Sequence, residues 1–185
     1  MKYKRVYVEK DNDLCIESKK LVREFRDYLG IDDLEYVRVV NVYDLVNVDE
    51  GNKDIIVNSI LNDSKLYHIS EELPVNDNEL AFRVELVKGQ FNQREDSMNI
   101  LVKRFLLDED KEVLHSKIII VNSISKESLD KIKSYYINPI ELKEIPLDSI
   151  SFEKESENIA DVEIINRFID FSESEVKNFK DKYGI

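Results

Sequence analysis

The sequence predicts an α+β fold made of two tandem βαββαβ-like copies. Three observations support this. Short segments alternate apolar and polar residues, as strands with one buried face do. The segments between them carry apolar residues at helical spacing. The order strand–helix–strand–helix–strand recurs after about 75 residues. Each copy would pack two helices on one face of a mostly antiparallel sheet. Two fused copies would imitate a symmetric dimer, so we expect a pseudo-two-fold axis between them.

Residues 1–70 form the first predicted copy. Its predicted strands are Lys4–Val8, Tyr36–Val48 and Lys65–Ile69, and the second is long enough to be two strands joined near Asn41–Asp44. A helix that Asp13 could cap runs to Gly30, a typical helix stop, and a second helix covers Asn52–Leu61. The polar, acidic stretch 71–79 then predicts a connection between the copies.

Residues 80–145 form the second predicted copy. Its strands are predicted at Leu80–Leu86, Val113–Ser123 and Ile140–Ile145, and the apolar run Ile118–Val121 indicates burial on both faces. A helix over Gln93–Leu107 would take Asn92 or Ser97 as its cap. Ser125 would cap the next helix, and Asn138-Pro139 would stop it, because proline disfavours helical geometry in the residue before it.

Residues 146–185 are predicted to be a linker followed by the start of a helical segment. Pro146–Asn158 is acidic and contains serines, and Ile159–Ile169 has helical spacing. Ser172–Glu175 matches a capping box at the start of one more helix.

The composition restricts the class of partner. The 185 residues carry a formal net charge of −12, which argues against a nucleic-acid partner, because binding a phosphate backbone needs clustered Lys and Arg. The single Cys15 cannot form an internal disulfide and is expected to be a buried structural thiol. No apolar run approaches the roughly 20 residues that span a bilayer. Without a membrane segment or signal peptide, the expected location is the cytoplasm.

A dense polar run follows the strand that begins the second copy. Gly89 permits a positive-φ turn after that strand, and a helix begins a few residues later. Loops at strand ends commonly carry binding groups, although a solvated turn with capping residues has the same composition. The candidate interface residues in this run are Gln90, Phe91, Asn92, Gln93, Arg94, Asp96 and Ser97.

The segment VKGQFNQREDS, which ends at Ser97, resembles PGQFDQRADS near the start of long-form phosphoribosylformylglycinamidine synthase. It departs from that pattern at Asn92, where Asp is usual, and at Val87-Lys88, where Leu-Pro is usual. The opening KRVYVEK, Val22–Ile31, the YVRVVNVYDL stretch and Tyr136–Pro139 follow in the family's order. The resemblance covers about the whole chain, but only the beginning of the enzyme. Asn138 and Pro139 are added to the candidate interface residues, because they are similar to a signature near the end of the family's separate small subunit.

The resemblance implies that the chain is an N-terminal module of a ligase and is not catalytic alone. The parent enzyme uses ATP and magnesium to activate the formyl-amide oxygen of formylglycinamide ribonucleotide, and glutamine-derived ammonia then displaces the phosphate. This module would contact the synthetase and glutamine amidotransferase domains, with Gln90, Gln93 and Arg94 hydrogen-bonding across the contact. Asp96 would hold Arg94 or cap the helix, and Ser97 could also cap it. The chain would therefore continue past Ile185.

The sequence itself offers little catalytic chemistry. His68 and His115 are far apart in predicted strands, so a partly buried or edge histidine is expected at each instead of a metal pair. No Gly-rich loop that could surround a phosphate is present. We expect no catalytic residues, no metal ligands and no cofactor in this chain. Two alternatives stay open: a free-standing regulatory module that binds a small ligand, and a small enzyme in its own right.

Overall fold

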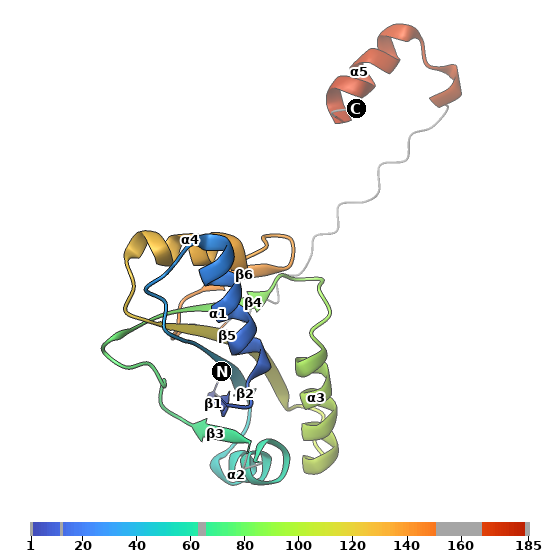
Figure 1. The fold of residues 1–185 in the computed structure, drawn as a ribbon. Coiled ribbons are helices and arrows are strands. Elements are labelled where there is room, and N and C mark those ends of the chain that lie inside the picture. The colour runs from blue at the N-terminus through green and yellow to red at the C-terminus, as the bar shows by residue number, and fades with distance from the viewer. Residues whose placement is uncertain (1, 12, 63–65, 151–167, 184–185) are drawn as a thin grey trace. The chain divides into compact units, whose positions relative to one another are not determined.

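Six strands pair into one antiparallel sheet with the order β3-β1-β2-β5-β4-β6 (Figure 1). The computed structural model describes residues 2–11, 13–62, 66–150 and 168–183. The strands are β1 (Tyr3–Lys10), β2 (Val37–Val46), β3 (Tyr67–Ser70), β4 (Glu79–Leu86), β5 (Glu112–Asn122) and β6 (Leu142–Ile145). The α-helices in this part of the chain are α1 (Ile16–Leu29), α2 (Glu50–Ile56), α3 (Gln93–Leu106), α4 (Lys126–Tyr136) and α5 (Glu173–Tyr183). The fold is therefore α+β, as predicted.

The first half of the chain confirms most predicted elements and corrects three details. The predicted stretch Tyr36–Val48 contains one continuous strand, β2 (Val37–Val46), and not two. Asp13 does not cap α1, because the helix begins at Ile16 with Cys15 in the cap position. The predicted third strand is shifted to Tyr67–Ser70. As predicted, α1 ends at Gly30, whose φ of 65° lies in the left-handed region and whose N–H donates to the Arg26 carbonyl.

The second half is also close to the prediction. Ser125 caps α4 by accepting a hydrogen bond from the Ser128 N–H. Asn92, and not Ser97, caps α3: its side chain accepts from the Glu95 N–H, while Ser97 lies inside the helix. The last strand begins at Leu142, two residues later than the predicted Ile140, because Asn138–Glu141 form a turn. The run Ile118–Val121 is fully buried, as expected.

One feature of the sheet differs from the expectation of one sheet for each copy. Strand β2 pairs with β5 from Val37↔Val121 to Val46↔Glu112, so the two halves share one continuous sheet. The β1–β2 pair on one side of these two central strands and the β4–β5 pair on the other side have the same register. Tyr3↔Val46 begins the β1–β2 ladder, and Glu79↔Asn122 begins the β4–β5 ladder at the corresponding place. All five strand pairs are antiparallel.

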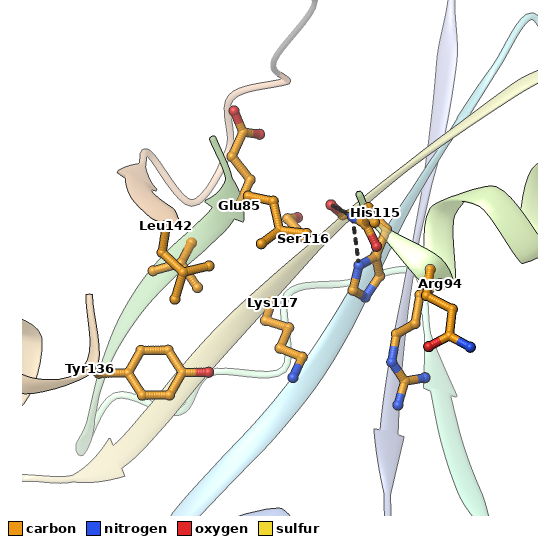
Figure 2. A pocket seen from close by; sticks show the side chains of 11 residues that line it. Glu85, Arg94, His115, Ser116, Lys117, Tyr136 and Leu142 are labelled. Carbon is orange, nitrogen blue, oxygen red and sulfur yellow. Dashed lines mark hydrogen bonds between the residues drawn. The ribbon is translucent and has the colours of Figure 1, made fainter. Parts of the chain in front are cut away.

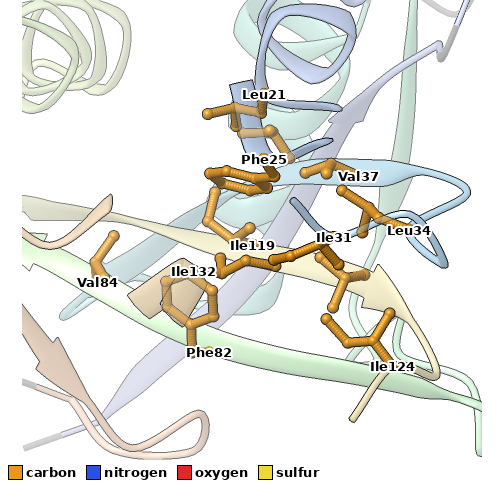
Figure 3. Packing of buried hydrophobic residues seen from close by; sticks show 12 residues of the cluster. Leu21, Phe25, Ile31, Leu34, Val37, Phe82, Val84, Ile119, Ile124 and Ile132 are labelled. Atoms are coloured by element: carbon orange, nitrogen blue, oxygen red, sulfur yellow. The ribbon is translucent and has the colours of Figure 1, made fainter. Parts of the chain in front are cut away.

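Helices α1 to α4 pack on one face of this sheet, over two separate hydrophobic clusters. Alternate residues of a strand point to the same face, and those of β2 at 37, 39, 43 and 45 contribute to the two clusters. One cluster joins α1 and α4 to the sheet through Phe25 and Ile132 (Figure 3). The other joins α2 and α3 through Ile56 and Val102. On this helix-covered face of the sheet, polar side chains lie between the two hydrophobic clusters.

The opposite face of the sheet carries a buried charge cluster. Asp44 accepts hydrogen bonds from Arg5 Nε at 2.6 Å and from Arg83 Nη2 at 2.9 Å, and both arginines are nearly inaccessible to solvent. The two guanidinium groups also donate to the main-chain carbonyls of Leu147 and Ser149. The chain after β6 is thereby held against this face, because buried guanidinium N–H groups need acceptors.

The chain divides into two units, Met1–Ser151 and Phe152–Ile185. In the second unit, η2 (Phe168–Asp170) precedes α5, and the predicted capping box is present. The Ser172 N–H donates to Glu175 Oε2 at 2.8 Å, and the Glu175 N–H donates to Ser172 Oγ at 3.4 Å. Most of the predicted helix Ile159–Ile169 lies outside the described residues.

Candidate functional site

Two stretches that the sequence singled out meet at one edge of the second half. The loop after β4 turns at Gly89, whose φ of 90° favours glycine. Gln90 Nε2 then donates to the Ile140 carbonyl at 3.2 Å, in the turn that contains Asn138 and Pro139. The Val87 N–H donates to the Glu141 carbonyl at 2.9 Å. The β4–α3 loop and the α4–β6 turn are therefore fixed side by side.

This edge exposes apolar side chains as well as polar groups. Phe91 and Ile140 are each 73% exposed. Asn138 and Pro139 are exposed in the turn, and Asn138 Oδ1 accepts from the Ile140 N–H at 3.2 Å. Loops with exposed apolar residues on a rigid sheet are typical of contact surfaces.

A cavity of about 260 Å³ lies beside this edge, on the helix-covered face of the sheet (Figure 2). Its lining comes from β4, the start of α3, the middle of β5, the end of α4 and the start of β6. The residues are Val84, Glu85, Leu86, Asn92, Gln93, Arg94, His115, Ser116, Lys117, Tyr136 and Leu142. Three predicted residues, Asn92, Gln93 and Arg94, therefore line the cavity.

His115 connects the cavity to the centre of the sheet. Its Nε2 lies 3.1 Å from Asn41 Oδ1, and its Nδ1 lies 3.4 Å from Asn92 Nδ2. Burial, together with the charges of Arg94, Lys117 and Arg83, lowers the pKa of His115 from 6.5 to about 3. The ring is therefore neutral at physiological pH. In that state Nε2–H can donate to Asn41, and Nδ1 can accept from Asn92.

Glu95, in the first turn of α3, also forms a hydrogen bond with His115. Its Oε2 accepts from the His115 N–H at 2.8 Å. Burial raises the pKa of this carboxyl group, and the hydrogen bond from His115 partly opposes that rise. Asn92 thus caps α3 and at the same time donates to the His115 carbonyl at 3.3 Å. These contacts fix the start of α3 on β5.

Two cations face the cavity from different directions. Lys117 Nζ lies 2.7 Å from Glu17 Oε1, which belongs to α1 in the first half of the chain. Arg94 interacts with Tyr43: burial raises the pKa of that hydroxyl, and the charge and hydrogen bond of Arg94 lower it. Burial also raises the pKa of Tyr136, so its hydroxyl stays protonated at neutral pH. The cavity therefore offers cationic and neutral hydrogen-bonding groups together with the carboxylate of Glu85.

The remaining predicted residues lie elsewhere. Asp96 and Ser97 are exposed on α3 and do not line the cavity. Asp96 was expected to hold Arg94 or to cap α3, but Arg94 interacts with Tyr43 and Asn92 is the cap. The two histidines do not form a metal pair: the His68 side chain is 74% exposed and lies 3.7 Å from Asp11.

Sequence reasoning missed several lining residues, and one signal could have found two of them. His115 and Lys117 occupy inward positions of β5 between the apolar Val113 and Ile119. Polar residues at inward positions of an otherwise apolar strand indicate a buried polar cluster. Glu85, Ser116 and Leu142 carry no comparable local signal, because only the pairing of strands brings them together.

The described residues contain no group of three or more His, Cys, Asp or Glu side chains arranged to hold a metal ion. Among these residues, no helix is both long enough and apolar enough to cross a membrane. Cys15 is buried, and the Ser18 hydroxyl lies 3.0 Å from its sulfur.

Comparison of the chain with known protein families, with curated proteins and with solved structures finds no match.

Proposed function

We propose that the two halves of Met1–Ser151 are copies of one βαββαβ-like unit related by a pseudo-two-fold axis. The palindromic strand order supports this, because it reads the same from either edge when β1, β2 and β3 are exchanged for β4, β5 and β6. The strand step, which is the difference in residue number between matching strand positions of the two halves, is the same from Tyr3 to Glu79 as from Val46 to Asn122. The same step takes Asn41 to Lys117, and these two residues face each other in the β2–β5 ladder. A two-fold axis at that pair would produce this arrangement.

The hydrophobic clusters give the strongest support for the repeat. The strand step takes nine buried residues of one cluster to nine of the other, with one extra residue before α3, whereas Ile31, Leu34 and Val39 have no counterpart among the buried members of the second cluster. The corresponding pairs are Leu21 with Met98, Phe25 with Val102, Val37 with Val113, Phe82 with Val6, Val84 with Val8, Ile119 with Tyr43, Val121 with Leu45, Ile124 with Val48 and Ile132 with Ile56. Nine matched positions in strands and helices support a repeat of one unit.

This repeat is the observation that carries the functional proposal. The segment around Gln90–Ser97 resembles long-form phosphoribosylformylglycinamidine synthase, whose N-terminus contains two fused copies of a small-subunit fold. We infer that the chain is this N-terminal module of the ligase. The ligase amidates formylglycinamide ribonucleotide with ATP and glutamine in purine biosynthesis, and the module is non-catalytic by itself.

In this proposal the module organises the contact between the synthetase and amidotransferase domains and assists ammonia transfer. The edge formed by Gln90, Phe91, Asn138 and Pro139 is suited to such a contact, because hydrogen bonds join its two loops and it presents apolar and polar groups together. Ammonia that passes between two active sites must be kept from solvent, which an ordered interface between domains can do.

The Arg94→Ala variant of the full-length enzyme tests the coupling role. We expect its glutamine-dependent rate to fall about tenfold, while its ammonia-dependent rate changes less than about twofold. Lys131→Ala, which removes an exposed cation from α4, is the control. If Arg94→Ala matches this control in both rates, the coupling role is wrong. A reading frame that stops after Ile185 would contradict the assignment to the ligase.

The cavity favours a second candidate function, a free-standing regulatory module that binds a small ligand. A cavity of about 260 Å³ lined by Arg94, Lys117, Tyr136 and Glu85 has the size of a site for a small polar ligand, and the cation of Arg94 could bind an anionic group of that ligand. Calorimetry of the isolated chain with candidate carboxylates and phosphates tests this function. Saturable binding that Lys117→Met abolishes would favour it over the ligase module.

A further inference from the structure

The outward side of α3 is unusually apolar for a helix that faces solvent. Ile100, Leu101 and Phe105 are 56%, 39% and 52% exposed. The inward side of the same helix is already occupied, because Met98 and Val102 are buried against the sheet. A helix with apolar residues on both sides has a second surface that water solvates poorly.

The corresponding helix of the first half shows that the fold does not require this surface. If the halves are repeats, as proposed above, Ile100, Leu101 and Phe105 correspond to Arg23, Glu24 and Tyr28 of α1. Two of those three positions are charged, and Tyr28 carries a hydroxyl group. The apolar surface is therefore specific to α3 and is not required for packing that helix on the sheet.

The outward side of α3 consists of two rows of residues spaced four apart. One row is Asp96, Ile100 and Arg104, and the other is Ser97, Leu101 and Phe105. Residues at this spacing lie above one another on a helix. The first row runs from acidic through apolar to basic, and the second runs from small through apolar to large.

When a second α3 helix runs in the opposite direction, its two rows of side chains complement those of the first helix. In an antiparallel pair of α3 helices, Asp96 of one copy faces Arg104 of the other, and each Ser97 leaves room for the facing Phe105. Ile100 and Leu101 meet their own counterparts at the centre. Within the described part of the chain, neither Asp96 nor Arg104 has an ion-pair partner, so both are available.

We propose that two copies of this chain associate through α3, packed antiparallel about a two-fold axis. A two-fold interface uses the same patch on both copies, which this surface satisfies. A net charge of −12 makes two copies repel each other at long range, so a dimer needs opposite charges within the contact itself. The two Asp96–Arg104 pairs supply them.

Sedimentation equilibrium of the 185-residue chain tests the proposal. We expect a species of about twice 21.8 kDa that becomes monomeric in Leu101→Asp and in Phe105→Asp. Tyr28→Asp places the same charge at the matching position of α1 and should leave the dimer unchanged. Circular dichroism and urea unfolding serve as folding controls for all three variants.

Charge reversal tests whether the specific Asp96–Arg104 pairs, and not only apolar contact, hold the two copies together. Asp96→Arg and Arg104→Asp should each raise the dimer dissociation constant at least about tenfold, because like charges then face each other twice. The double variant should return it to within about threefold of the wild-type value. A wild-type chain that stays monomeric at about 100 μM overturns the proposal. The proposal is also overturned if the dimer of the double variant has a dissociation constant as high as those of the single variants. Either failure leaves the ligase assignment untouched, since that assignment depends on the repeat and on the resemblance around Gln90–Ser97 and not on the outward side of α3.

Discussion

His115 is the residue with the most constrained chemistry in the candidate site. Asn41, Asn92 and Glu95 hold its ring and main chain, and Tyr43 packs on its ring at 5.2 Å between centroids. These partners come from β2 and from the start of α3. A buried imidazole with satisfied nitrogens can stay neutral, but protonation would place an unpaired charge among Arg94 and Lys117.

This environment predicts a pH dependence of stability. The folded-state pKa of about 3 lies below the ordinary value of 6.5, so the unfolded chain binds the proton more tightly. The contribution of His115 is complete above pH 6.5 and is lost as the pH falls toward 3, with a slope of up to about 1.4 kcal/mol per pH unit. Urea unfolding of wild type and His115→Gln from pH 7 to pH 4 should give free energies that converge as the pH falls.

His68→Gln is the matched control, because that side chain is 74% exposed. Its unfolding free energy should run parallel to that of wild type across the same pH range. If the His115→Gln profile is also parallel, then the imidazole is not held neutral by the fold.

At the scale of elements, the start of α3 links the loop to the sheet. Asn92 accepts from the Glu95 N–H at 3.2 Å and donates to the His115 carbonyl at 3.3 Å. An N-cap satisfies a main-chain donor that the helix leaves open. The same side chain therefore orients α3 and closes one wall of the cavity.

Substituting the cap should destabilise the fold more than substituting the other cap candidate. Asn92→Ala should lower the free energy of unfolding by about 1–2 kcal/mol, since it removes the cap and the contact with His115. Ser97→Ala, on the exposed side of the same helix, should change it by less than about 0.5 kcal/mol. Urea denaturation followed by circular dichroism measures both. Equal effects would mean that the cap of α3 lies elsewhere.

At the scale of the whole molecule, the long β2–β5 ladder joins two hydrophobic clusters. Ile56 of α2 belongs to one cluster and Ile132 of α4 to the other, and both are fully buried. Because both clusters rest on the same two central strands, the halves of Met1–Ser151 should unfold together.

Ile56→Ala and Ile132→Ala test this cooperativity with the same chemical change in each half. Each should cost about 2–5 kcal/mol, because it leaves a cavity in a packed core. Far-UV circular dichroism and tyrosine near-UV signals should report one coincident urea transition in wild type and in both variants. Two separate transitions, of which only one moves in each variant, would show that the halves fold independently.

The sequence by itself determined the order and type of the elements, because these depend on periodicity and local signals. Alternation located the strands, helical spacing located the helices, and Gly30, Ser125 and the Ser172–Glu175 capping box marked helix ends at the observed places. It also located the polar loop after β4. The cap of α3 stayed open between Asn92 and Ser97, because both residue types cap helices and only the backbone decides.

Only the tertiary structure decided how the halves join and which side chains meet. The register of β2 against β5 makes one sheet and brings His115 to Asn41, and Lys117 of β5 reaches Glu17 of α1. The structure also brings Gln90 to Ile140 and gathers Arg5, Asp44 and Arg83 on the other face. The physical reason is that the hydrophobic pattern of one strand decides which face it buries but not which distant strand it pairs with.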